Sequence, residues 1–232
     1  MLILLAPSKT KELKLTTNLQ ATDPLFIKET NHLHKILKGF SKAELGKIMK
    51  IKNKLLDNAY SDILSFTSSC PGMAIESFNG LVYKGLAKDS YQEPEYNYLE
   101  KNLLILDAFY GIIKPSTLIK NYRLDFLMKL GINLYDYWNI DNYLNDEVII
   151  NLASKEFSKM IKSTKVITVS FLQNKHGKLI NQATYSKQAR GLFLNYLVIN
   201  KIEDLVSITK FDLDNYKYNK SLSDEWNIKF TR

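Results

Sequence analysis

The stretch that decides the fold is the amino-terminal run Leu2-Ile-Leu-Leu-Ala6, which is followed at once by Pro7-Ser8-Lys9-Thr10. A continuous apolar run that stops at a proline is typical of a buried strand. Polar residues directly after such a strand lie at the carboxyl edge of a sheet, where ligands bind in open α/β proteins. The alternative is an ordinary turn in which Ser8 and Thr10 satisfy backbone donors.

Further strands follow along the chain. Leu103–Leu106 and Val148–Ala153 are apolar runs that predict two more buried strands. Two runs late in the chain flank a turn sequence and predict a β-hairpin: Val166–Leu172, Leu179–Thr184 and the turn Asn174-Lys-His-Gly177. The tail, 208–230, alternates around aromatic residues and predicts two short strands.

Helical patterns alternate with these strands. Ser41 with Glu44 three residues later forms a capping-box pattern, which opens a helix that we expect to run to about Leu64. On that helix Lys47, Lys50 and Lys54 would share one face, either solvated or a binding stripe. The pattern at 122–130 fits a strand or a helix. The other predicted helices cover 23–38, 90–101, 134–145 and 185–201.

The interleaved elements predict a mixed α/β fold with a mixed sheet, flanking helices and a late antiparallel portion. The 232 residues, 45% of them hydrophobic, can bury one core without a disulfide or a metal to stabilise it. We therefore expect a single compact domain over 1–232. Cys70 is the only cysteine, which excludes an intramolecular disulfide and a thiolate zinc site.

The expected location is the cytoplasm. Single-cysteine usage fits a reducing compartment, and Met1–Ala6 has neither the length nor the basic start of a signal peptide. No apolar run approaches the roughly 20 residues of a membrane span, so we expect no membrane partner. No feature indicates an obligate protein partner.

The charge distribution favours a polyanionic ligand. The chain carries a formal charge of +8, with net charges of +6 in 1–60, −4 in 61–110 and +6 in 111–232. A net positive charge favours a nucleic-acid ligand, although a lysine-rich composition without any ligand would give the same net charges. There are only 3 Arg among 32 basic residues, and Arg232 is terminal. Arg123 and Arg190 can form the planar fork that binds phosphate or carboxylate, or a structural ion pair.

Several signatures of enzymes and cofactor sites are missing. The sequence has no GxGxxG, GxxxxGK[ST], GxSxG or HExxH, and its three histidines are scattered, so we expect no cofactor and no metal. Asn151, Ser154 and Glu156 lie on or just after the 148–153 strand, the same edge as Ser8 to Thr10. A hydroxyl, an ammonium and free N–H groups in one loop can hold an anionic oxygen.

Short pieces spread over nearly the whole chain match one known family: Leu2–Thr10, Phe78–Leu86, Phe109–Pro115, Tyr122-Arg-Leu124, Leu134–Trp138, Ile150–Ser154 with Glu156-Phe157, and Tyr185–Gly191. In these pieces and in their order, the chain resembles the YaaA family of bacterial peroxide-stress proteins. Each piece is short, but together they are specific.

The resemblance implies resistance to hydrogen peroxide through limitation of unincorporated intracellular iron, an α/β fold with a positively charged cleft, and sequence-independent DNA binding. It places Lys9, Arg123, Lys187 and Arg190 in that cleft. Together with Ser8 and Thr10 of the loop after the first strand, these are the candidate DNA-binding or anion-binding residues. The possible lining residues are Asn79, Tyr110, Gly111, Asn151, Ser154 and Glu156. It also implies a helix-hairpin-helix-like element, for which the glycine-bearing segment Tyr110-Gly111 is the candidate.

The chain departs from the family's pattern in three ways, one of which is a tail that is shorter and less acidic than is usual. Asp107-Ala108 stands where the family has Ser-Gly, and Asp107 would add negative charge where a phosphate approaches the expected hairpin. Gln188 stands where the family has a lysine.

Two functions remain open at this point. The first is a protein of the peroxide response that binds duplex or distorted DNA without sequence preference. The alternative is an enzyme of unknown reaction on a phosphorylated or carboxylated small molecule in the same cleft, where Glu156 could move a proton. Direct iron sequestration is not favoured, because three His and one Cys do not make a ligand cluster.

Overall fold

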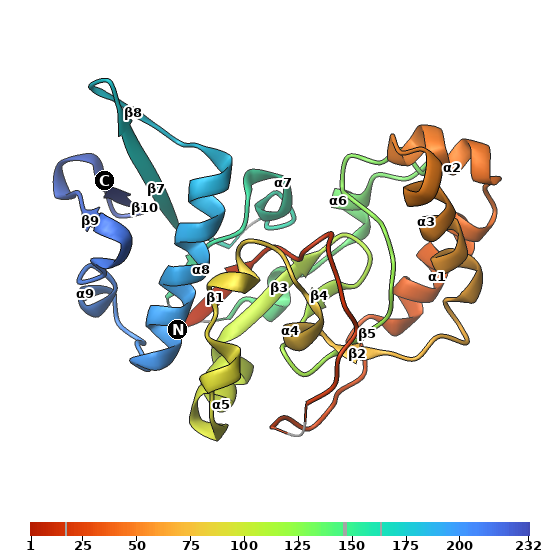
Figure 1. The fold of residues 1–232 in the computed structure, drawn as a ribbon, viewed down its shortest axis with the longest axis horizontal. Helices are drawn as coiled ribbons and strands as arrows, with labels where there is room; N and C mark the ends of the chain where they lie inside the picture. The colour runs from red at the N-terminus through yellow and green to blue at the C-terminus, as the bar shows by residue number, and fades with distance from the viewer. Residues whose placement is uncertain (17, 146–147, 163) are drawn as a thin grey trace.

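The computed structural model describes residues 1–16, 18–145, 148–162 and 164–232. Its centre is a mixed sheet in the order β4-β3-β1-β6-β7-β10-β9, with β8 paired to β7 (Figure 1). The strands are β1 (Leu2–Leu5), β3 (Leu103–Asp107), β4 (Gly111–Ile113), β6 (Ile149–Asn151), β7 (Ile167–Lys175), β8 (Lys178–Ile180), β9 (Lys217–Tyr218) and β10 (Asn227–Thr231). A separate antiparallel pair joins β2 (Gly72–Met73) to β5 (Leu118–Ile119).

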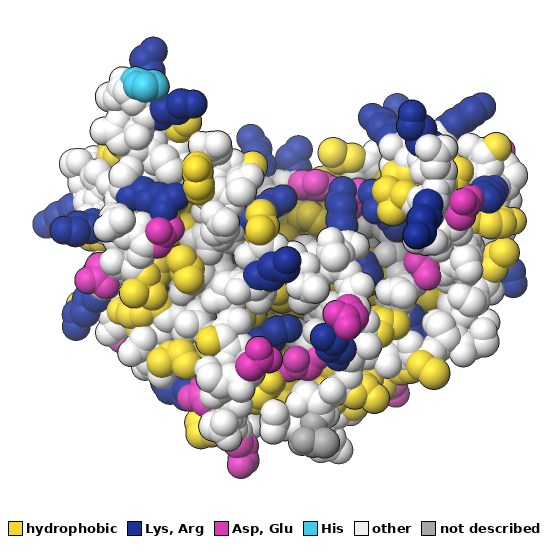
Figure 2. Space-filling model, viewed as in Figure 1, with side chains coloured by type: hydrophobic (Ala, Val, Ile, Leu, Met, Phe, Trp, Pro, Cys, Tyr) yellow, Lys and Arg dark blue, Asp and Glu magenta, His cyan; other side chains and the backbone are white. Residues whose placement is uncertain are grey.

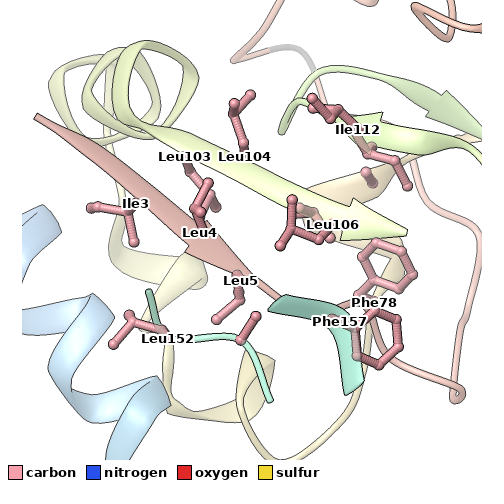
Figure 3. Packing of buried hydrophobic residues seen from close by; sticks show 14 of the residues in the cluster. Ile3, Leu4, Leu5, Phe78, Leu103, Leu104, Leu106, Ile112, Leu152 and Phe157 are labelled. Atoms are coloured by element: carbon pink, nitrogen blue, oxygen red, sulfur yellow. The ribbon is translucent and has the colours of Figure 1, made fainter. Parts of the chain in front are cut away.

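Strand β1 lies between β3 and β6 and runs parallel to both. Ile3 is opposite Leu103 on one side and Ile150 on the other. All four residues of β1 are buried, as the unbroken apolar run predicts. Figure 3 shows the side chains of Leu4 and Leu5 among those of β3 and the segment after β6. Each large apolar side chain buried in this way stabilises the fold by about 1.5–3 kcal/mol.

Helices cover the sheet. Helix α5 (Glu93–Asn102) packs on β1 and β3, and α8 (Ala183–Ile199) packs on β7. The short helical segments are α4 (Ala74–Ser77), α6 (Leu134–Tyr137), α7 (Lys155–Ser158), α9 (Leu205–Ile208) and the 3-10 turns η1 (Tyr83–Gly85), η2 (Lys88–Ser90), η3 (Asp141–Tyr143), η4 (Leu213–Asn215) and η5 (Lys220–Leu222). The predicted α/β class with a mixed sheet and flanking helices is confirmed. Within the described ranges, no helix is long and apolar enough to cross a membrane.

Helices α1 (Ile27–Lys38), α2 (Lys42–Met49) and α3 (Asn53–Ser65) form a cluster to one side of the sheet (Figure 1). The capping box of Ser41 and Glu44 is confirmed, but the prediction of one helix from Ser41 to about Leu64 is wrong. Lys50 adopts a left-handed conformation with φ 53°, and the N–H of Ile51 closes back onto the carbonyl of Gly46.

This break also removes the shared face predicted for Lys47, Lys50 and Lys54, because they lie on two helices and the turn between them. No glycine or proline marks the turn in the sequence, which explains why the pattern suggested one helix.

The segment after β5 differs most from the predictions. Residues 122–130 form neither a strand nor a helix, although Leu124, Phe126 and Met128 are buried. The helix predicted for 134–145 is limited to α6 and η3. Trp138 ends α6 in an extended conformation, and its buried indole N–H donates to the carbonyl of Ala108 at 3.0 Å. Tertiary burial of the aromatic ring therefore overrides local helical preference.

The late part of the chain follows the prediction in outline, but the second hairpin strand is shorter than the predicted Leu179–Thr184, because β8 ends at Ile180 and α8 begins at Ala183. Strands β7 and β8 form an antiparallel hairpin whose turn residues, His176 and Gly177, have φ of 53° and 79°. Strands β9 and β10 also pair antiparallel, and β10 pairs parallel to β7, a contact that the sequence pattern does not show.

Helix α8 meets η1 at two glycines. A Cβ atom on Gly85 would lie 2.7 Å from Cα of Gly191, and one on Gly191 would overlap the carbonyl oxygen of Val82. Only hydrogen at both positions allows this backbone approach, which holds the 80–83 segment against α8.

We expect Gly191→Ala to lower the free energy of unfolding by about 3 kcal/mol, because rigid backbone atoms would have to move apart. Denaturant unfolding measures the loss. Gln188→Ala, an exposed change on the same helix, should stay within about 0.5 kcal/mol of the original chain. Equal stability of both variants would contradict the close approach.

Candidate functional site

A cleft of about 410 Å³ lies at the carboxyl ends of β1 and β6. The chain leaves β1 toward β3 on one side and leaves β6 toward β7 on the other. Such a change of direction between neighbouring parallel strands opens a crevice that serves as the usual ligand site of α/β sheets. The cleft is lined by 5–11, 80–83, 122–125, residues after β6, and Lys187 and Arg190 of α8.

The structure brings most of the predicted site residues together here. The cleft is lined by Ser8, Lys9, Thr10, Arg123, Ser154, Glu156, Lys187 and Arg190. With Lys11, five cationic side chains face two carboxylates, those of Asp125 and Glu156. Figure 2 shows the surface hollowed between two flanks that carry Lys and Arg side chains.

Four possible lining residues lie elsewhere. Asn79 is exposed on a neighbouring hollow beside Lys84 and Lys88. Asn151 is buried and holds local structure. Its amide N–H donates to the hydroxyl of Thr168, and its side-chain oxygen accepts the N–H of Ala153. Tyr110 is buried in the connection between β3 and β4, and Gly111 is buried as the first residue of β4.

The expected hairpin at Tyr110-Gly111 therefore cannot present its backbone to a phosphate. The N–H of Tyr110 donates to the Asp107 carboxylate at 2.9 Å, and Gly111, with φ +77°, is enclosed by the rings of Trp138 and Phe26. Two helices joined by a short turn do occur at α2 and α3. Exposed lysines cluster at that turn: Lys47, Lys50, Lys52 and Lys54.

Asp107 also has a different role from the one expected. It is fully buried, so its charge does not face the surface where a ligand would approach. Its carboxylate accepts the N–H groups of Phe109 at 2.7 Å and Tyr110 at 2.9 Å, and it accepts the hydroxyl of Tyr122. Burial raises the pKa of this carboxyl, while the three hydrogen bonds oppose that rise. Asp107 thus fixes the turn that supports the cleft floor.

The loop after β1 is held by neighbours distant in sequence. The hydroxyl of Tyr83 donates to the carbonyl of Ala6 at 2.9 Å, and the N–H of Asn79 donates to the carbonyl of Thr10 at 3.0 Å. Gly80 allows the approach of Ser8, whose hydroxyl would lie 2.5 Å from an added Cβ. The 78–83 segment therefore shapes the loop that carries Ser8, Lys9 and Thr10.

The charged side chains along the cleft differ in whether their polar atoms have a partner. Lys9 is ion-paired with Asp125 at 2.6 Å, with 61% of its side chain exposed. Among the described residues, Nε of Arg123, Nε of Arg190 and Oε1 of Glu156 are buried without a hydrogen-bond partner. Burial raises the pKa of Glu156 and lowers that of Arg190. Buried polar atoms cost free energy unless a partner satisfies them, so these atoms indicate a ligand with both acceptors and a donor.

Like Asp125, Lys11 is a cleft residue that the sequence reasoning missed. It lines the cleft floor, and Nζ lies 3.9 Å from the ring centroid of Tyr122. Burial lowers the pKa of Lys11 to about 8; the charge of Arg123 lowers it further, while Asp107, Asp62 and Asp125 oppose the shift. In the sequence Lys11 is one of several lysines near the start of the chain, and only the tertiary structure distinguishes it.

Metal ligands are not gathered in this part of the molecule. Across the residues that the structure describes, no group of three or more His, Cys, Asp and Glu side chains could hold a metal ion. The lone cysteine, Cys70, is exposed.

Comparison with known proteins gives consistent matches. Residues 1–222 match the family described as peroxide stress protein YaaA. A UPF0246 protein of Fusobacterium nucleatum is 41% identical over 245 residues, covering 100% of this chain and 99% of the relative. UPF0246 proteins of Clostridium beijerinckii and Francisella philomiragia are 36% and 34% identical, covering all of this chain and 98% and 100% of the relatives.

We expect Asp107→Asn to destabilise the protein by about 2 kcal/mol at neutral pH, because the amide cannot accept all three hydrogen bonds. The matched change Asp23→Asn, at an exposed position, should have little effect. Urea unfolding of both variants provides the measurement.

The difference in the free energy of unfolding between the original chain and Asp107→Asn should change with pH in a defined direction. Because burial raises the pKa of Asp107 in the folded state, the original chain loses stability as pH rises from the unfolded pKa of about 3.9 through the folded one. Asp107→Asn lacks that contribution, so the gap between the two proteins should narrow with rising pH. A gap that widens over this range would contradict the raised pKa.

Proposed function

Because the chain belongs to the peroxide stress protein YaaA family, we propose that it protects against peroxide by binding DNA without sequence preference through the basic cleft and by limiting unincorporated intracellular iron. The general role in peroxide stress follows from the family. DNA binding and the effect on iron are the finer parts of the proposal.

The observation that carries DNA binding is the charge of the cleft. Five cationic side chains line it against two carboxylates, and one of those carboxylates already neutralises Lys9. Lysine and arginine contacts to phosphates supply most sequence-independent affinity and carry no base information. The two buried arginine Nε atoms without partners suit phosphate oxygens, which accept several hydrogen bonds.

The flanks of the hollow extend this basic surface. The α2–α3 turn carries Lys47, Lys50, Lys52 and Lys54, and the tip of the β7–β8 hairpin carries Lys175 and Lys178, all exposed. A nucleic acid is long enough to contact the cleft and a flank at once, whereas a small metabolite is not. The distribution of lysines beyond the cleft therefore favours a polymer.

We expect duplex DNA binding that weakens steeply with salt. Lys187→Ala should reduce the slope of log K against log salt by about 1, and Arg190→Ala should do the same and weaken binding at every salt concentration. Fluorescence anisotropy of a labelled duplex measures both quantities.

Lys101→Ala is the matched control. Lys101 lies just before β3, at the opposite edge of the sheet from the cleft, and is ion-paired with Glu203 at 2.8 Å. Its removal should leave the salt slope unchanged. Affinity that does not depend on salt, or an equal loss in Lys101→Ala, would argue against DNA binding in the cleft.

The effect on iron is tested in cells. Peroxide-treated cells that lack the chain should contain more chelator-accessible iron by electron paramagnetic resonance, and the original chain should restore the lower level. The Lys187→Ala/Arg190→Ala double variant should not, if iron limitation depends on the same cleft. Restoration by that variant would separate the two activities.

A second candidate function is an enzyme acting on a small anionic substrate in the same cleft. The observation that favours it is the combination of two arginine Nε atoms and one carboxylate oxygen that are buried without partners, since pure phosphate binding requires no acceptor. The two candidates separate in the experiments above. Loss of peroxide protection in Arg190→Ala with full DNA affinity would favour the enzyme.

A further inference from the structure

The amine of Lys11 differs from the other lysines of the cleft in its surroundings. Lys9 forms an ion pair with Asp125, and Lys187 is exposed on α8. Within the described chain, the Lys11 amine has no hydrogen bond and no ion pair, and it lies over the rings of Tyr122 at 3.9 Å and Phe78 at 5.9 Å. A half-buried amine without a carboxylate partner is poorly suited to being a simple structural charge.

The backbone of Lys11 is held firmly. Lys11 forms a bridge with Phe78, the N–H of Glu12 donates to the carbonyl of Ser77 at 2.9 Å, and the N–H of Asn79 donates to the carbonyl of Thr10 at 3.0 Å. The Tyr122 ring beneath the amine is fixed in turn by its hydrogen bond to Asp107. The structure therefore directs one amine into the cleft from a rigid support, as a nucleophilic group requires.

The surroundings also make this amine more reactive than an ordinary lysine. With a pKa of about 8, roughly a tenth of Lys11 is unprotonated at pH 7, against less than about 0.1% for a lysine at its usual pKa. The charged groups that face it are Asp107 of β3, Asp62 of α3, and Arg123 and Asp125 of the segment after β5. Desolvated lysines of this kind attack carbonyl carbons to form imines.

The rest of the cleft fits a sugar attached to phosphates. Arg123 and Arg190 hold buried Nε atoms that need acceptors, and Glu156 holds a buried oxygen that needs a donor. A volume of about 410 Å³ is in the range of small-ligand sites. In DNA, the sugar with a free aldehyde is the abasic deoxyribose, which rotates out of the duplex at low cost because no base is stacked.

We propose that Lys11 captures abasic sites in DNA by forming an imine with the ring-open C1′ aldehyde, while Arg123 and Arg190 hold the adjacent phosphates. This inference rests on the proposed DNA binding and names its substrate. The Nζ lone pair attacks C1′, the carbonyl electron pair moves to oxygen, and one proton passes from the nitrogen to that oxygen. The hydroxyl then takes a second proton, which protonated Glu156 can supply, and leaves as water as the C=N bond forms. The iminium nitrogen returns its proton to the Glu156 carboxylate, which leaves the neutral imine. Hydrolysis by water reverses these steps and restores the amine.

Borohydride trapping tests the proposal. A labelled duplex with one abasic site, and the same duplex without it, are incubated with the full-length chain and sodium borohydride, whose hydride reduces C=N to a stable secondary amine. We expect a denaturation-resistant adduct with the abasic duplex alone, and a modified peptide that contains Lys11. The trapping rate should rise about tenfold per pH unit up to about pH 8 and then level off.

Lys11→Arg is the decisive variant, because it keeps the positive charge but cannot form an imine. We expect trapping to fall at least 100-fold at protein concentrations that saturate the labelled duplex. Lys14→Met is the control: Lys14 is an exposed lysine of the same segment, lies outside the cleft and is paired with Glu12 at 3.2 Å. It should trap as well as the original chain. Urea unfolding of each variant verifies that it folds.

Three results would overturn the proposal in distinguishable ways. Equal trapping by Lys11→Arg, or an adduct on another lysine, would remove Lys11 from the chemistry. Salt-dependent binding of both duplexes without any adduct would leave DNA binding standing and refute the imine. Failure to bind either duplex at low salt would refute both the DNA proposal and this one.

Discussion

The burial of β1 between β3 and β6 is the constraint on which the rest of the structure depends. Its four apolar residues have neighbours on both sides and both faces, so the chain that follows must emerge at the carboxyl edge of the sheet. The chain leaves β1 and β6 in opposite directions, and a cleft opens there. The position of the site is therefore a consequence of strand order, and its chemistry is supplied by loops.

Close backbone approaches then decide the shape of that cleft. The contact between Gly85 and Gly191 sets the 80–83 segment against α8, and Gly80 leaves room for Ser8. Asp107, fully buried, organises the connection to β4 and holds Tyr122, on which Lys11 rests. A buried carboxylate that satisfies two backbone N–H groups and a phenol is costly to desolvate but specifies one arrangement of the cleft floor.

The cleft combines two kinds of charge. Exposed or paired lysines such as Lys9 and Lys187 suit transient contact with a polyanion in water. Arg123, Arg190, Glu156 and Lys11 are more deeply placed, and their unsatisfied atoms or lowered pKa indicate a ligand that enters the cleft. A single site can therefore combine an exposed basic surface, which suits a polyanion, with a deeper pocket, which suits one unit of that polyanion.

The sequence alone determined the α/β class, the buried strands, the late hairpin and the loop residues at the strand ends, because apolar runs, capping boxes and turn residues act over a few positions. It did not show that α2 and α3 are separate, that Tyr110 and Gly111 are buried, or that Asp107 is internal. It placed Lys9 in the site and did not identify Lys11. The pKa of Lys11 depends on groups from three distant parts of the chain, Asp62, Asp107 and Arg123. Only tertiary folding brings those groups together and removes the amine from water. The composition therefore shows the positive charge of the chain, and the structure shows which lysine has a lowered pKa.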